Sequence, residues 1–160
     1  MHSQKQAFTM IELVFVIVVL GILAAVAIPK FAATRTDAQI SKGRADISSI
    51  RSAIISERQS RLITGDNTYI AGGNGVLQLD NGAGGVGTGP LFGGVLTYSI
   101  NDAINDGQWH NVSRDVNSST YNYKLGGVNI LFTYTRSNGI FTCADGNVTQ
   151  SQIYCGNLIH

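Results

Sequence analysis

Residues 8–28 read FTMIELVFVIVVLGILAAVAI, and this stretch of 21 residues decides the fold. Its polar side chains are those of Thr9 and Glu12, and from residue 13 to residue 28 no side chain carries a charge or a hydrogen-bonding group. As an α-helix the stretch would be about 31 Å long, close to the hydrocarbon thickness of a bilayer. A core helix of a soluble protein rarely runs this far without polar residues, so the stretch predicts a membrane-spanning helix.

The helical pattern continues beyond this apolar stretch. Ile47, Ile50 and Ile54 are spaced three and four residues apart, as on one face of a helix, and many of the remaining positions are polar. A helix from about residue 8 to about residue 62 would be roughly 80 Å long, apolar all round in its first half and amphipathic in its second. A secretory signal peptide is the alternative, but it should have a shorter apolar run and no acid in it.

Glu12 is the one charged side chain inside the apolar stretch. A carboxylate in hydrocarbon costs on the order of 2.5–3.5 kcal/mol, so an acid there usually has a function and a partner. Residues 9–12 also form the capping-box pattern T-x-x-E, in which the carboxylate would complete the start of the helix. The other interpretation needs a cation, which a new amino terminus at Phe8, one helical turn away, would supply. Both interpretations are open at this point.

Residues 5–13, KQAFTMIEL, resemble the prepilin motif of type IV pilins and type II secretion pseudopilins. That motif has a short basic leader, a small residue, Phe-Thr-Leu-Ile-Glu, and an apolar helix that contains a proline. The resemblance implies that a prepilin peptidase cuts between Ala7 and Phe8 and methylates the new amine of Phe8. Removal of the first seven of the 160 residues leaves 153 and makes Glu12 the fifth residue. Ala7 stands where the family has Gly, and Met10 stands where it has Leu.

Pro29 matches the proline of the motif, and the resemblance implies that Glu12 and Pro29 act in assembly. A proline inside a helix removes one backbone hydrogen bond, which offers a place to bend or to melt locally. The alternative is that Pro29 marks the end of the helix at the membrane interface.

The resemblance also implies location and partners. The subunit would pass once through the inner membrane with its head in the periplasm, and would then join a periplasmic or cell-surface fibre made of copies of itself and of other pilins or pseudopilins. The charge pattern points the other way, because four basic residues follow the span within 16 positions and only Lys5 precedes it. The implied parts are a leader at 1–7, a transmembrane helix at 8–28, an amphipathic helix at 29–62, and a glycine-rich connection with a β-sheet head at 63–160.

The head has the pattern of an antiparallel sheet. Residues 65–94 hold 11 of the 19 glycines and predict a long irregular connection. Strand-like runs follow at residues 95–100, 121–125, 128–136 and 140–144. Asn138-Gly139 predicts a two-residue hairpin in which Tyr134 faces Cys143 and Arg136 faces Phe141. One face of the sheet would then be apolar and would pack on the isoleucine face of the helix. The predicted fold class is α+β and pilin-like, a long N-terminal helix on a small antiparallel sheet.

Cys143 and Cys155 are the two cysteines of the chain. If bonded, they would close a loop of 13 residues, worth roughly 3 kcal/mol in the chain-entropy model. Such a bond is similar to the disulfide in the carboxy-terminal region of many type IV pilins, which major pseudopilins usually lack. Two free buried thiols are one alternative. A zinc site with His110 or His160 is another, but it would lack the usual close pairing of ligands.

The sequence predicts no cofactor. Calcium binding is the alternative that it leaves open. Major pseudopilins bind calcium near the sheet, so the resemblance makes Asp102, Asp106 and Asp145 calcium candidates. The D-x-D-x-D-G order of a calcium loop is not present, and acids in solvated turns explain the same residues.

Composition narrows the class of function. Charged residues make up 13% of the chain and the formal net charge is +1, which gives no bulk attraction to nucleic acid. A DNA-binding minor pilin is the alternative function, but the part past residue 62 has three basic residues against six acids, a net charge of −3. Three scattered histidines and isolated acids assemble no catalytic arrangement, so the sequence predicts a structural protein and not an enzyme.

Overall fold

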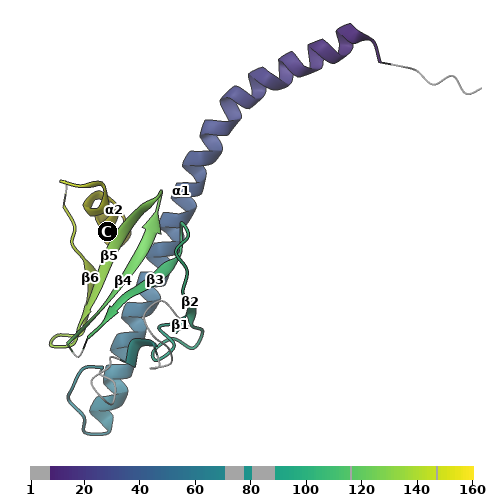
Figure 1. Ribbon diagram of the computed structural model, residues 1–160. Helices are drawn as coiled ribbons and strands as arrows, with labels where there is room; N and C mark the ends of the chain where they lie inside the picture. The colour runs from purple at the N-terminus through teal and green to yellow at the C-terminus, as the bar shows by residue number, and fades with distance from the viewer. Residues whose placement is uncertain (1–7, 71–77, 81–88, 116, 147) are drawn as a thin grey trace, which may run out of the picture. The chain divides into compact units, whose positions relative to one another are not determined.

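The computed structural model describes residues 8–70, 78–80, 89–115, 117–146 and 148–160, without the side chains of residues 32, 33 and 78. The chain divides into two compact units, Met1–Asp37 and Ala38–His160. Helix α1 (Met10–Ile63) begins in the first unit and ends in the second (Figure 1).

In the first unit, α1 is apolar and uncovered. Every large apolar side chain from Phe8 to Phe31 is at least 37% exposed within the described chain. Among the described residues, α1 is the one helix that is long and apolar enough to cross a membrane. The helix continues through Pro29, so the interpretation of Pro29 as the helix end is wrong.

In the second unit, α1 ends in a Schellman motif. The backbone N–H of Asp66 donates to the carbonyl of Arg61 at 2.9 Å, and that of Gly65 donates to the carbonyl of Leu62 at 3.2 Å. Gly65 has a φ of 87°, a conformation that costs glycine little because it has no Cβ. The predicted helix end near residue 62 is confirmed.

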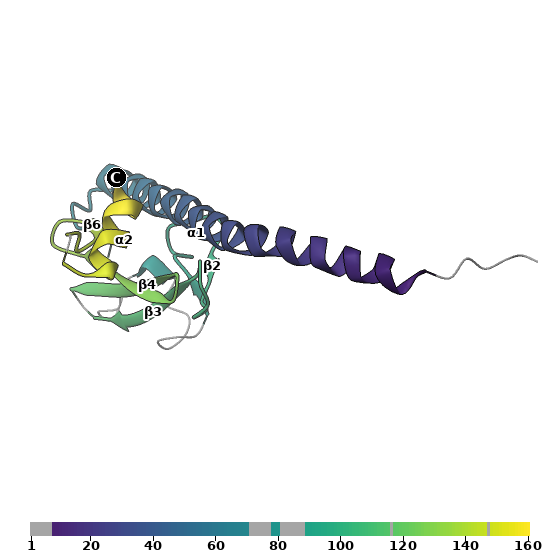
Figure 2. The same cartoon turned by 90° about the horizontal axis from the view of Figure 1, so that it is seen from above.

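A four-stranded antiparallel sheet packs on this part of α1 (Figures 1 and 2). In spatial order its strands are β3 (Trp109–Arg114), β4 (Ser118–Leu125), β5 (Val128–Thr135) and β6 (Ile140–Cys143). The buried face of the sheet and the isoleucine face of α1 form one core, which includes Ile47, Ile50, Ile54, Trp109, Tyr121, Tyr123, Phe132, Tyr134 and Phe141. The predicted α+β fold, a long helix on an antiparallel sheet, is confirmed.

The β5–β6 hairpin has a different register from the predicted one. Thr135 pairs with Ile140 and Tyr134 pairs with Phe141, so the loop contains the four residues 136–139 and the predicted pairing of Tyr134 with Cys143 is wrong. A two-residue type I′ turn needs positive φ at both central residues, and here Gly139 has a φ of 69° while Asn138 is not among the residues with positive φ. The shift is by two residues, so each side chain stays on the predicted face.

Three other elements differ from the sequence prediction. Of residues 95–100, only Ile100 lies in a strand, β2 (Ile100–Asn101), which pairs with β1 (Pro90–Leu91). The N–H of Leu96 instead bonds back to the carbonyl of Phe92 at 2.8 Å and closes a turn. Strand β3 and helix α2 (Gln150–Ile159) were not predicted.

The glycine-rich connection is anchored in the core by a short helical turn, η2 (Gln78–Asp80). Asp80 is buried, and its Oδ1 accepts the backbone N–H of Phe92 at 2.6 Å. Its Oδ2 accepts the hydroxyl of Tyr121 at 2.8 Å and the Nε of Arg114 at 3.0 Å. Burial, and then the charge of Asp80, raises the pKa of the Tyr121 hydroxyl, so this hydroxyl remains a hydrogen-bond donor. Residues 71–77 and 81–88 of the connection lie outside the described residues.

We expect Asp80→Asn to lower the free energy of unfolding by about 3–5 kcal/mol, because the buried guanidinium of Arg114 loses this carboxylate. Denaturant unfolding of the purified chain in detergent, followed by the fluorescence of Trp109, measures the change. Asp115→Asn, at an exposed turn position, is the matched control and should unfold as the wild type does. Equal stability of the two variants would contradict the anchoring role of Asp80.

Candidate processing and assembly site

The N-terminus of α1 is capped by Thr9 and Glu12, which form the capping box that the T-x-x-E pattern predicts. Oε2 of Glu12 accepts hydrogen bonds from the backbone N–H and from the hydroxyl of Thr9, each at 3.3 Å. The backbone N–H of Glu12 donates in return to Oγ1 of Thr9 at 3.3 Å. The first helical bond runs from the N–H of Leu13 to the carbonyl of Thr9 at 3.2 Å. The carboxylate therefore has local partners in this structure, as the capping interpretation requires.

Phe8 directly precedes the capping residue, and its side chain is 82% exposed. An amino group created at Phe8 would lie at the same end of α1 as the carboxylate of Glu12. Ala7, on the other side of the predicted cut, lies outside the described residues. Cleavage between Ala7 and Phe8 therefore stays a prediction.

No basic side chain is near Glu12 along the helix. The next basic residue after it is Lys30, 18 positions further, which corresponds to about 27 Å of helix. In apolar surroundings a carboxylate that keeps its charge needs a cation close by. An amine at Phe8, of the same chain or of a neighbour, would supply this cation close to Glu12. Lys30 is too far along the helix to do so.

Pro29 lies inside α1 and has no backbone N–H to donate. The carbonyl of Ala25, four residues earlier, therefore lacks its usual helical partner. The role of Pro29 in assembly stays a prediction.

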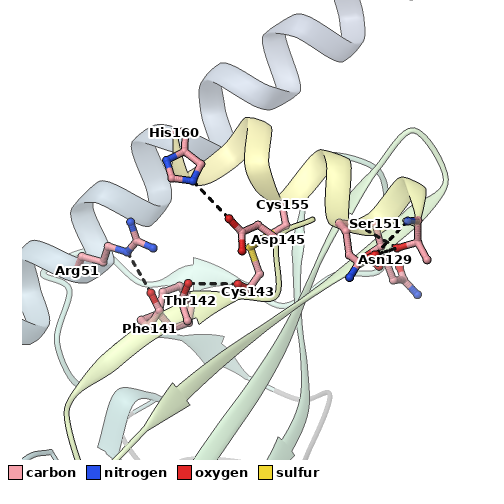
Figure 3. Close-up of a disulfide and its surroundings, with 11 residues drawn as sticks. Arg51, Asn129, Phe141, Thr142, Cys143, Asp145, Ser151, Cys155 and His160 are labelled. Carbon is pink, nitrogen blue, oxygen red and sulfur yellow. Dashed lines mark hydrogen bonds and ion pairs between the residues drawn. A yellow bond between two sulfur atoms is a disulfide. The ribbon is translucent and has the colours of Figure 1, made fainter. Parts of the chain in front are cut away.

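The second pair of predicted residues, Cys143 and Cys155, forms a disulfide, and both alternatives for these cysteines are wrong (Figure 3). The bond joins the last residue of β6 to α2, with 6.0 Å between the two Cα atoms. Both cysteines are buried. Because both sulfur atoms are in this bond, neither cysteine can provide the thiolate ligand that the zinc site requires. Of its two histidines, His110 contacts Asp102, and His160 contacts Asp145.

Helix α2, which carries Cys155, is the element near this site that sequence reasoning missed. It begins at a capping box in which Thr149 and Gln152 exchange hydrogen bonds, the pattern T-x-x-Q. That pattern was available as a signal in the sequence. A further contact holds the helix to the sheet, from the hydroxyl of Ser151 to the carbonyl of Asn129 at 3.2 Å (Figure 3).

The three calcium candidates have separate protein partners. Oδ1 of Asp102 lies 2.6 Å from Nδ1 of His110, and Oδ1 of Asp106 accepts the backbone N–H of Gly127 at 2.9 Å. Oδ2 of Asp145 lies 3.4 Å from Nε2 of His160. Over the ranges that the structure describes, no three acids, histidines or cysteines are grouped as metal ligands.

We expect the double variant Cys143→Ala/Cys155→Ala to lose about 3 kcal/mol of unfolding free energy, because the unfolded chain regains the freedom of a 13-residue loop. Denaturant unfolding in detergent measures this loss. The wild type unfolded in a strong reductant is the matched comparison and should coincide with the variant. An oxidised wild type no more stable than the variant would contradict a stabilising role.

Comparison with protein families matches residues 2–28 to the prokaryotic N-terminal methylation motif. Comparison with curated proteins and with solved structures finds no significant match. The matched residues contain Phe8, Glu12 and the apolar stretch that the first unit of the structure leaves uncovered. The chain thus joins a pilin-like α+β fold to an N-terminal methylation motif that is typical of type IV pilins and type II secretion pseudopilins.

Proposed function

We propose that this chain is a structural subunit of a helical fibre, either a type IV pilus or a type II secretion pseudopilus. The observation that carries the proposal is that the methylation motif continues directly into a helix whose apolar side chains have no cover in the described chain. Burial of a large apolar side chain is worth roughly 1.5–3 kcal/mol, so 16 such side chains from Phe8 to Phe31 require an apolar environment outside the chain.

Two environments would supply this cover in succession. Residues 8–28 first span the inner membrane, with the leader 1–7 in the cytoplasm and the head 63–160 in the periplasm. The oxidising periplasm is compatible with the disulfide in the head. The same helix then leaves the lipid for a bundle of identical helices in the fibre. This transfer costs little because apolar surface stays covered throughout. The subunit contributes no catalytic step.

Processing by a prepilin peptidase is the first step of the proposed pathway. The enzyme cuts between Ala7 and Phe8 and methylates the new amine. We expect the mature protein, purified from the expressing cell, to begin at Phe8 and to carry one methyl group on the α-amine of that residue, a net gain of CH2 in mass. N-terminal sequencing and intact-mass measurement test this. A mature protein that still begins at Met1 would overturn the proposed function.

Glu12 is the residue that would set the position of each subunit in the fibre. Contacts between apolar helices have little directional preference, so a fixed position needs a polar interaction, and the amine of Phe8 is the available cation. The capping box offers a competing role for the same carboxylate, since it accepts two hydrogen bonds from Thr9.

Two substitutions of Glu12 separate these roles. Glu12→Gln removes the charge but keeps an oxygen that can accept the capping bonds, whereas Glu12→Ala removes both. We expect both variants to insert in the membrane and both to lose fibre assembly, because assembly depends on the charge. Membrane fractionation and electron microscopy of sheared fibres give the two readouts. Normal fibres from Glu12→Gln, with none from Glu12→Ala, would assign Glu12 to capping alone.

A further inference from the structure

A groove with two arginines follows one flank of α1 in the second unit. Its volume is about 360 Å³, and α1 lines it with Arg44, Ser48, Arg51, Ser52 and Ile55, among others. The residues at the end of α2 form its other wall. The groove therefore combines an apolar floor with positive charge.

The charges of these two arginines are not balanced by acids. Nε of Arg44 donates to the carbonyl of Asn157 at 2.7 Å, and Nε of Arg51 donates to the carbonyl of Phe141 at 3.0 Å. Within the described part of the chain, neither guanidinium forms an ion pair. Their remaining N–H groups and their planar faces are suited to an aromatic ring or a carboxylate.

The opposite flank of α1 carries a surface with the complementary chemistry. A cavity of about 340 Å³ is lined there by Asp46 and Ser49 from α1 and by the loop of residues 96–100. Asp46 is the charged residue among the described lining residues, and its Oδ2 already accepts a hydrogen bond from Nε1 of Trp109 at 3.0 Å and lies 3.9 Å from Nζ of Lys42. The side chain of Tyr98, on that loop, is 88% exposed. This flank thus presents an uncovered aromatic ring to a neighbouring copy.

The two surfaces lie roughly opposite each other around the helix. At about 100° per residue, Ser48, Arg51 and Ile55 fall on one side of the buried isoleucine face. Asp46 and Ser49 fall on the other side. An open fibre is built by heterologous contacts, in which one surface of a copy meets a different surface of the next. Opposite flanks of one helix meet this requirement.

We propose that the arginine groove of one copy receives the Tyr98 loop, residues 96–100, of a second copy of this chain. Tyr98 packs on the apolar floor at Ile55, with its ring against the guanidinium groups of Arg44 and Arg51. The inference rests on the proposed fibre function and adds to it the contact between neighbouring heads. The groove and the loop both belong to the second unit, so each copy offers one of each.

A cysteine pair tests this contact. Ser52 lines the groove, Thr97 lies beside Tyr98, and both are exposed. The native cysteines are bonded to each other and buried. In fibres sheared from cells that express Ser52→Cys/Thr97→Cys, mild oxidation should give a ladder of disulfide-linked multimers on a non-reducing gel. Each single-cysteine variant, and Thr97→Cys combined with Asn129→Cys on β5, should give fibres without the ladder.

The outcomes separate the inference from the proposed function. Fibres of the double variant without a ladder overturn the inference and leave the fibre function intact. A wild-type chain that forms no fibres overturns the proposed function itself. Cross-linking of Ser52→Cys to a different protein overturns the second copy as the occupant.

A bulky substitution gives a second readout. Ser52→Trp fills the groove and should abolish fibres, whereas Ser56→Trp, at an exposed position of α1 outside the groove, should leave their yield unchanged. Equal yields from these two variants also overturn the inference.

Discussion

An apolar helix that the described part of its chain does not cover requires an apolar environment from outside, and this requirement governs the molecule. The large apolar side chains from Phe8 to Phe31 are exposed in the described chain, whereas Ile47, Ile50 and Ile54 of the same helix are buried by the sheet. One helix therefore serves two environments. Its first part needs an apolar environment outside the described chain, and its second part is the central element of a folded head.

Two different kinds of interaction hold segments of the head to the sheet, a buried carboxylate with its hydrogen bonds and a disulfide. Asp80 holds the glycine-rich connection through the backbone of Phe92 and the side chains of Tyr121 and Arg114. The disulfide holds α2 to β6. Both interactions act at a small core that hydrophobic burial alone would stabilise only modestly. With these segments fixed, both flanks of α1 in the head have defined surfaces, and the proposed contact between copies uses them.

Much of the fold could be predicted from periodicity. The long helix, its end near residue 62 and the faces of β5 and β6 follow from hydrophobic spacing, which depends only on local geometry. The predicted strand at 95–100 was wrong up to Ile100, because the backbone N–H groups of Val95 and Leu96 bond back to the carbonyl of Phe92 in a turn. The hairpin register was wrong by two residues because the backbone at Asn138 does not adopt the positive φ of a type I′ turn. The residues of β3 include several polar side chains, so the sequence does not show the alternation of apolar and polar residues that would predict this strand.

At the candidate site, the motif by itself predicted which residues matter, Phe8, Glu12 and the apolar stretch, because their chemistry depends on neighbours within one or two helical turns. The tertiary structure decided the interactions between residues far apart in the chain. It placed Asp80 against Arg114, bonded Cys143 to Cys155, and formed the arginine groove from α1 and α2. No local pattern encodes these pairings, because they exist only when the sheet and both helices share one core.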